Sequence, residues 1–179
     1  MNIFFLSFEP SECAELYCDQ HVVKILLEIV QMLYTAWHFL GPPEWNQTAP
    51  FKNNSNQRGY LPVSNPKHAM VMWVRSSQEN YRWVSQLGLA LSSEFTRRFK
   101  KVHSCDPHIK WLSSNIPPTF TEVRNEKAYY SSKGFPENLT QIPLCMKEKY
   151  HNPNVLVANI KNYLGEKSIF ARWTHVYDS

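Results

Sequence analysis

The sequence feature that most limits the possible folds is a long segment near the N-terminus that contains neither glycine nor proline. It covers residues 20–39, and Gly41-Pro42-Pro43 follows shortly after it. Because glycine commonly ends a helix and proline cannot continue one, these signals predict one long helix, with Asp19 as its cap. Apolar side chains cover most of its circumference, which is typical of a helix at the centre of a protein.

The remaining segments also favour helices, joined by irregular connections. The 179 residues include only 5 glycines but 12 prolines, a balance that disfavours repeated tight β-hairpins. We therefore predict an all-α fold, a compact single domain of residues 1–179 with about three main helices and long Pro-rich loops. The other expected elements are an extended segment (2–8), a helical turn (11–17), a polar surface loop (51–60), a helix from Asn65 with a second piece starting at Ser77, short turns only (105–153), and a last helix (154–173).

Charge and composition narrow the functional class without selecting one. A formal net charge of +4 permits a polyanionic partner but does not require one. The longest apolar stretch, residues 22–40, contains Lys24, Glu28 and Gln31, so we expect no membrane span. Residues 1–6 lack the basic start of a signal peptide, and the four cysteines are expected to be reduced thiols. Together these features predict a cytoplasmic protein.

Five polar side chains interrupt the apolar surface of the predicted long helix. At ~100° per residue they fall on one narrow stripe, which consists of His21, Lys24, Glu28, Gln31 and Thr35. On a largely buried helix such groups either neutralise one another as a structural network or line a cleft for acid, base or anion-binding chemistry. Both interpretations remain open at the level of the sequence.

Further candidate ligand-binding residues are basic. Four of them, at the end of the second predicted long helix, are Arg97, Arg98, Lys100 and Lys101, and Arg58 lies in the polar loop. Clusters of this kind are either a solvated surface or a phosphate-binding face. Arg75 stands beside Ser76-Ser77 and belongs either to a helix start or to a ligand contact.

One group of residues has the composition of a zinc site. His103, Cys105 and His108, with Cys145 and His151 downstream, are residue types that bind zinc. Their spacing matches no standard zinc pattern. We therefore predict neither a metal nor another cofactor.

Three separated segments resemble one known family, the phage pyrimidine-dimer DNA glycosylases called endonuclease V. The run Cys18-Asp-Gln-His-Val-Val-Lys-Ile-Leu-Leu-Glu28 is similar to that family's first-helix motif, in which Asp-Gln-His is followed seven residues later by an essential glutamate. The other matching positions are His68, Trp83, Glu94 and Arg98 in the middle of the chain, and Glu166-Lys167 with Trp173 near its end. The sequence resembles still more a set of phage and large-virus proteins with the pattern Trp-x-Arg-x-Ser-x-x-Asn-Tyr-x-Trp, found here at residues 73–83.

The resemblance implies a specific chemistry. In endonuclease V the α-amine exposed by removal of the initiator Met attacks C1′ of a flipped nucleotide and forms a Schiff base, and the glutamate supports the sugar chemistry and strand cleavage. Glu28 matches that glutamate. The family's small threonine after Met is Asn2 here, which is bulky enough to disfavour Met removal, so the candidate nucleophile is the α-amine of Met1. Leu27 and Gln31 stand where the family has arginines.

Two functional hypotheses follow. The first is a viral DNA glycosylase or glycosylase/AP lyase that acts on a damaged or modified base, with Glu28, Met1 and His21 as catalytic residues. The second is a non-catalytic viral protein on the same scaffold that sequesters a nucleotide-like ligand, for example a host immune signalling nucleotide. Both place the protein in the host cell cytosol or nucleoid, and the expected contacts to DNA or nucleotide are Lys24, Gln31, His68, Arg75, Arg58, Arg97, Arg98, Lys100 and Lys101.

Overall fold

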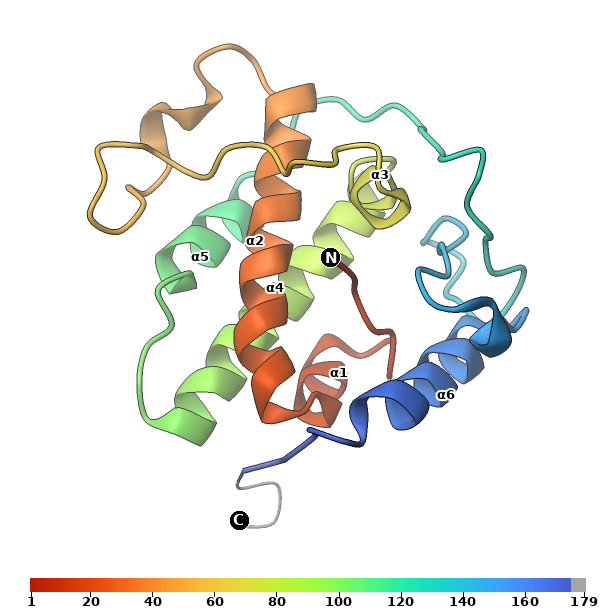
Figure 1. The fold of residues 1–179 in the computed structure, drawn as a ribbon. Helices are drawn as coiled ribbons and strands as arrows, with labels where there is room; N and C mark the ends of the chain where they lie inside the picture. Colours follow the sequence, from red (N-terminus) through yellow and green to blue (C-terminus); the bar gives the residue numbers. More distant parts are fainter. Residues whose placement is uncertain (175–179) are drawn as a thin grey trace.

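The computed structural model describes residues 1–174 and shows an all-α protein (Figure 1). The all-α prediction is confirmed, because these residues form six α-helices, two short 3-10 helices and no β-strand. The prediction of about three main helices is too low, since three shorter α-helices pack with the long ones. The α-helices are α1 (Pro10–Leu16), α2 (Asp19–Leu40), α3 (Ala69–Val74), α4 (Gln78–Phe99), α5 (Asp106–Ser114) and α6 (Val155–Lys167), and the 3-10 helices are η1 (Trp45–Thr48) and η2 (Glu148–Tyr150).

The helix α2 passes through the middle of the molecule, as its sequence predicts (Figure 1). It contacts α3, α4 and α5, and its apolar side chains, such as Leu26, Ile29 and Leu33, are fully buried. By length and composition α2 could also cross a membrane, but 67% of that stretch is buried inside the protein, which is the pattern of a core helix. Cys18 occupies the N-cap position, and Asp19, the expected cap, is instead the first helical residue.

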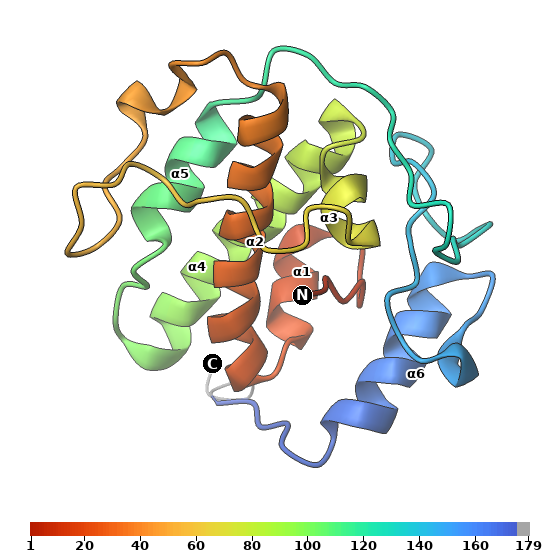
Figure 2. The same ribbon diagram turned by 45° about the horizontal axis from the view of Figure 1, so that its top comes forward.

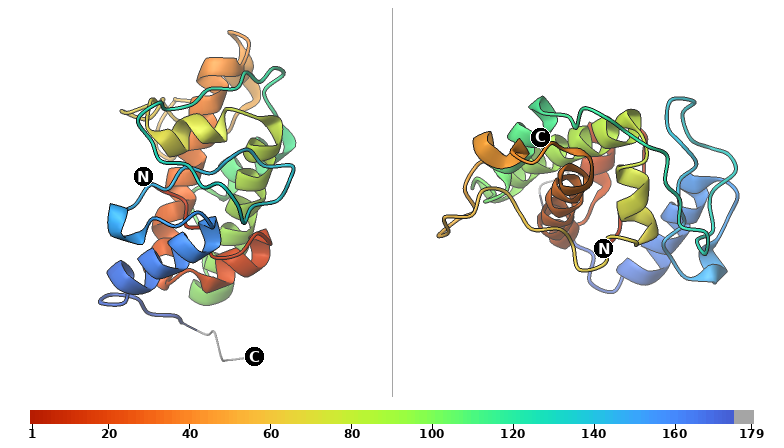
Figure 3. Two further views of the ribbon diagram at one scale, coloured as in Figure 1. Left: turned by 90° about the vertical axis from the view of Figure 1, so that its right-hand side faces the viewer. Right: turned by 90° about the horizontal axis from the view of Figure 1, so that it is seen from above.

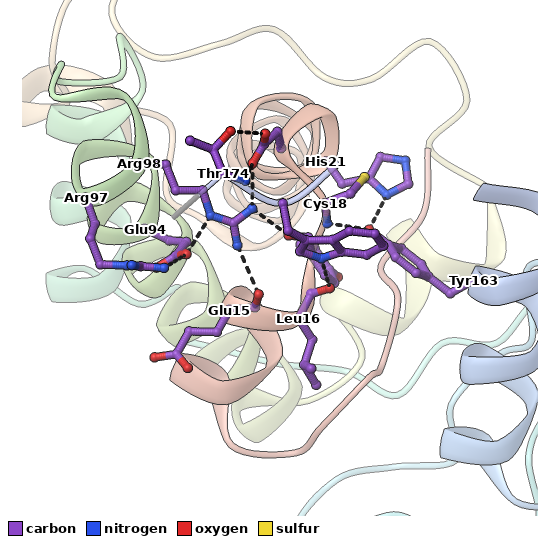
Figure 4. A network of polar contacts seen from close by, with 12 residues as sticks. Glu15, Leu16, Cys18, His21, Glu94, Arg97, Arg98, Tyr163 and Thr174 are labelled. Atoms are coloured by element: carbon purple, nitrogen blue, oxygen red, sulfur yellow. Dashed lines mark hydrogen bonds and ion pairs between the residues drawn. The ribbon is translucent and has the colours of Figure 1, made fainter. Parts of the chain in front are cut away.

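A buried arginine joins the end of α4 to the start of α2 (Figure 4). The Arg98 side chain is fully enclosed and bonds to Glu94 at 2.6 Å and to Asp19 at 3.0 Å. It also donates to the backbone carbonyls of Tyr17, at 2.8 Å, and Glu15, at 3.0 Å. The expected role of Arg98 as a phosphate contact is therefore wrong: its donors face acceptors of the protein itself, and the residue fixes α1, α2 and α4 together.

A nine-residue helix, α5, lies in the region where the sequence predicted only short turns. Its proline, Pro107, stands in the first turn, where the missing N–H removes no helical hydrogen bond. Ile109 and Leu112 are fully buried, so the helix is held by packing against α2 and α4. Gly88 of α4 permits this close approach, because a Cβ there would lie 2.4 Å from Ile109 Cδ1.

The last helix, α6, is shorter than predicted. It begins where expected, with the Asn154 side chain accepting hydrogen bonds from the N–H groups of Leu156 and Val157, but it ends at Lys167. The chain then returns to α2, where Arg172 O accepts from Asp19 N at 2.7 Å and Trp173 Nε1 donates to Leu16 O at 3.0 Å. These contacts replace the expected continuation of the helix to residue 173. Residues 175–179 of the predicted domain lie outside the described part of the chain.

The N-terminal segment lies between α2 and α6 (Figure 2). Residues 2–5 have neither helical nor strand hydrogen bonding, and they are held by side chains on both sides. Asn2 N–H donates to Glu28 of α2 at 3.1 Å, and Phe5 N–H donates to Asn159 of α6 at 3.1 Å. The long connection between α5 and α6 passes α3 on its way to α6 (Figure 3). The fold thus brings residues from both ends of the chain to the polar side of α2.

Candidate functional site

A cavity of about 390 Å³ lies beside the N-terminus, between α2, α6 and the segment that precedes η2. Its size is within the range of ~300–1,000 Å³ that is usual for small-molecule pockets. Five residues predicted from the sequence line it: Met1, His21, Lys24, Glu28 and His68. Along residues 21–28, the polar stripe of α2 therefore lines a cleft and is not enclosed as a purely structural network.

Glu28 is the carboxylate that is hydrogen-bonded to the N-terminal segment. Its side chain is 12% exposed, and Oε2 accepts the hydrogen bond from Asn2 N–H, while Lys24 Nζ lies 3.7 Å from Oε1. The α-amine of Met1 is one residue away from that N–H. Burial lowers the pKa of His68, the positive charge of the N-terminus acts in the same direction, and the charge of Glu28 opposes both. An amine and a carboxylate thus share one cavity.

His21 is a neutral group in this site. Burial lowers its pKa to about 4, and the positive charges of Lys167 and Lys24 act in the same direction. Its Nδ1 lies 2.8 Å from the hydroxyl of Tyr163, and its ring stacks on Phe4 with centroids 5.0 Å apart. Because the imidazole is uncharged at neutral pH, it can accept or donate one hydrogen bond to a ligand but adds no positive charge.

The C-terminal part of the chain supplies a second charged wall. Glu166 accepts hydrogen bonds from Lys147 Nζ at 2.9 Å and from the Tyr150 hydroxyl at 2.8 Å, and Lys149 Nζ lies 3.2 Å from it. Bonds from Lys147, Tyr150 and Lys149 lower the pKa of the Glu166 carboxyl to about 2. Lys167 also lines the cavity. The groups facing the cavity therefore include three lysines and the α-amine against two carboxylates, an arrangement that favours an anionic ligand.

Lys147, Glu166 and Lys167 are site residues that the sequence does not predict as such. A signal for two of them is present, because Glu166-Lys167 is one of the segments that resemble endonuclease V. Lys147 carries no signal of its own: it lies in a Pro-rich connection, lines the cavity and bonds to Glu166. The pair joins this connection to the end of α6, and such a tertiary contact cannot be read from spacing in the sequence.

Gln31 lies outside this cavity and lines a neighbouring one of about 260 Å³, to which Met1 also contributes. Arg75 and Arg58 line neither. Arg75 is 7% exposed, donates to Pro66 O at 2.6 Å and lies over the Phe39 ring at 4.3 Å. Arg58 donates to Ala49 O at 2.7 Å and lies over the Phe51 ring at 3.9 Å. The structure gives Arg75 a local packing role in place of the expected ligand contact. Arg58 also lines a third cavity, of about 360 Å³, so its contact to a ligand stays a prediction.

The rest of the basic cluster lies at the far end of α4, and its members line neither cavity. Arg97 is paired with Glu94 at 2.6 Å. Lys100, in the left-handed conformation with φ of 55°, is the C-cap of α4, and Lys101 follows it at the surface. The structure does not bring these three residues together with Glu28, so any contact they make to a ligand is remote from the cavity.

The zinc-like residues are dispersed in the fold. Within residues 1–174 no three His, Cys, Asp or Glu side chains gather in a geometry for a metal ion. His103 Nδ1 accepts from Cys105 N–H at 3.0 Å, and His108 Nδ1 lies 2.8 Å from the Tyr34 hydroxyl. Both histidines are buried hydrogen-bonding residues around α5.

Comparisons of the chain with models of known protein families, with curated proteins and with solved structures found no match. The chemical class of the site therefore has to be argued from its own residues.

Proposed function

We propose that the protein is a viral DNA glycosylase or glycosylase/AP lyase that acts on a damaged or modified base, with the α-amine of Met1 as nucleophile. One observation carries the proposal: the hydrogen bond from Asn2 N–H to Glu28 holds the N-terminus and a carboxylate in one cavity. As a class, α-amines are less basic than lysine side chains, which makes an α-amine the more available nucleophile near neutral pH.

The amine, Glu28 and solvent water together account for each proton transfer. The neutral amine attacks C1′, a C–N bond forms, the glycosidic bond breaks, and the base departs with the bonding electron pair and the proton released by the amine. The C1′–O4′ bond then opens, O4′ takes up a proton from solvent by way of Glu28, and a protonated Schiff base remains. Glu28, again a carboxylate, removes a proton from C2′, and the electron pair expels the 3′-phosphate. This sequence accounts for both base release and strand cleavage.

Lysines around the cavity complement the negative charge of the nucleic acid. The Nζ of Lys24 is near Glu28, and Lys147 and Lys167 approach from the opposite wall. His21, held neutral by burial and by Lys167 and Lys24, supplies a hydrogen bond to the sugar without competing for the phosphate. A cavity of about 390 Å³ has the dimensions of part or all of one nucleotide rather than of a duplex, which agrees with an enzyme that extracts its target from the duplex. Such a protein works in the host cell cytosol or nucleoid.

The test is borohydride trapping on a duplex that contains one abasic site. The wild-type protein is expected to give a covalent adduct and to nick the strand, whereas Glu28→Gln is expected to lose strand cleavage by at least about 100-fold, within the range for loss of a general base. Glu137→Gln removes a carboxylate from an exposed loop and is expected to behave as wild type. If the wild-type protein neither nicks nor is trapped, the lyase is ruled out.

A second candidate function rests on the position of the Met1 α-amine relative to Glu28. The N–H that contacts Glu28 belongs to Asn2, so the α-amine of Met1 lies one residue beyond the bonded position. Displacement of a nucleophile by ~1 Å can cost orders of magnitude in rate. The same cationic cavity would then hold a nucleotide-like ligand without turnover. In that case the chain is a viral protein that sequesters a host signalling nucleotide.

A thermal-shift screen of cyclic and linear nucleotides tests this second function. A ligand at 100 times its Kd stabilises the folded protein by ~2.7 kcal/mol, and the absence of a shift with all of them excludes the function.

A further inference from the structure

A second cavity, lined by different kinds of side chain, adjoins the cavity that contains Glu28. Met1 lines both, so the two cavities adjoin at the N-terminus. Gln31 follows Glu28 by three residues, a rise of ~4.5 Å along α2, and faces the second cavity. The opposite wall of that cavity is formed by residues 60–64, with Lys52 and Gln57 from the polar loop. The polar stripe of α2 therefore passes from one cavity into the next.

Neutral groups dominate the second cavity. The half-buried side-chain amide of Gln31 has no hydrogen-bond partner within residues 1–174, and the Thr35 hydroxyl bonds to its backbone carbonyl instead. Gln57 donates through Nε2 to Gly59 O at 3.2 Å, which leaves its side-chain oxygen as an acceptor. Tyr60 presents a half-buried ring, stacked at 5.9 Å on the ring of Tyr34. No carboxylate lines this cavity, and Lys52 is its one side-chain charge among the described residues.

This combination suits a flat, uncharged heteroaromatic group. Amide side chains recognise base edges because they offer a donor and an acceptor side by side. Bases extracted from a duplex are held by such bonds together with aromatic and apolar walls, and Leu61, Pro62 and Val63 supply apolar surface here. The first cavity, with its lysines, suits instead the sugar and phosphate.

We propose that the second cavity is the base subsite and that Gln31 is the residue that reads the base edge. The proposal rests on the proposed function, because it places the sugar of the target nucleotide beside Met1 and Glu28 and its base beside Gln31. A single nucleotide spans both cavities. The ligand class is then a nucleotide with an uncharged base, and Gln31 determines which base is accepted.

A binding comparison tests the subsite. Calorimetric titrations use the four deoxynucleoside 5′-monophosphates, 5-hydroxymethyldeoxyuridine 5′-monophosphate, and 1,2-dideoxyribose 5-phosphate, which has neither a base nor a carbonyl that could react with the amine. At least one nucleotide is expected to bind the wild-type protein at least about tenfold more tightly than the sugar phosphate. Gln31→Leu is expected to abolish that advantage and to leave the affinity for the sugar phosphate within about twofold. Gln86→Leu, the same change on the exposed side of α4, is the matched control and is expected to alter neither.

Equal affinity of the wild-type protein for the nucleotides and the sugar phosphate would overturn the proposal. A second result would also overturn it: Gln31→Leu, shown by circular dichroism to be folded, binds the sugar phosphate and the nucleotides more weakly by the same factor. Gln31 would then contact the sugar or phosphate of the ligand and not its base. Trapping of the wild-type protein on the abasic duplex reports on the lyase alone, because that substrate has no base at the site. If the wild-type protein is not trapped, the proposed lyase activity is excluded but the proposed base subsite is not. The two proposals can therefore fail separately.

Discussion

At the scale of single residues, His21 shows how the fold changes the meaning of a sequence pattern. In the sequence, the spacing of His21 from Lys24 and Glu28 suggests that the histidine is a partner of the Glu28 carboxylate. In the structure its ring lies between Phe4 and Phe170, and Nδ1 bonds to Tyr163. Burial and the charges of Lys167 and Lys24 hold its pKa at about 4, so the residue is a neutral hydrogen-bonding group.

A pH dependence of stability follows from this environment. In the unfolded chain the imidazole takes up a proton below a pH of ~6.5, but in the folded protein only below about 4. Between these values the unfolded state binds more protons, so the free energy of unfolding falls as the pH is lowered from ~6.5 to ~4, by up to about 3 kcal/mol from this residue. Urea denaturation of wild type and His21→Gln at pH 7 and pH 4.5 measures the contribution. The variant is expected to lose less stability on acidification, and equal losses would contradict the assigned pKa.

At the scale of elements, the arginine of α4 has a structural role that its sequence context hides. Arg98 belongs to a cluster of four basic residues that looks like a phosphate-binding face, yet it alone is buried. It connects three helices through Glu94, Asp19 and the carbonyls at the end of α1 (Figure 4). Asp19 in turn accepts a hydrogen bond from Thr174 N–H at 2.9 Å. One side chain thereby fixes the start of α2, on which the candidate site is built.

Removal of the Arg98 charge is expected to lower the free energy of unfolding. Arg98→Met removes one of the two arginine partners of the buried Glu94 carboxylate and leaves two backbone carbonyls without this donor. The loss for breaking a buried ion pair in this way is about 3–5 kcal/mol. Arg82→Met, on the exposed side of the same helix, is expected to change the free energy of unfolding by less than about 0.5 kcal/mol. Chemical denaturation measures both. A loss below about 1 kcal/mol for Arg98→Met would show that the network contributes little.

The elements differ in how far the sequence predicts them. The course of α2 and α4 is predictable because both lack proline and carry long helical patterns. Helix α5 is not, because a proline in its first turn gives the same signal as a proline that breaks a helix, and only the burial of Ile109 and Leu112 distinguishes the two cases. The end of α6 depends on hydrogen bonds from the returning chain to Asp19 and Leu16, which lie more than 150 residues away in sequence.

At the scale of the whole molecule, the candidate site is an assembly of both ends of the chain. The α2 side of the cavity is predictable from helical spacing, which places Lys24 and Glu28 on one face. The opposite side is formed by Lys147, Glu166 and Lys167, and its position is set by the packing of α6 against the N-terminal segment. The net charge of +4 is thus accompanied by a local excess of positive groups at the cavity, while Arg97, Lys100 and Lys101 lie elsewhere.

The central claim is that the α-amine beside Glu28 is the nucleophile, and mass spectrometry of the borohydride-trapped adduct tests it most directly. The protein is trapped on an abasic duplex, digested, and the modified peptide is sequenced, with a protein carrying a short Gly-Ser extension before Met1 as the control. The account predicts that the deoxyribose remnant is on the α-nitrogen of Met1 and that the extended protein gives at least about 100-fold less adduct. A remnant on Lys24, Lys147 or Lys167, or equal trapping of the extended protein, would contradict it.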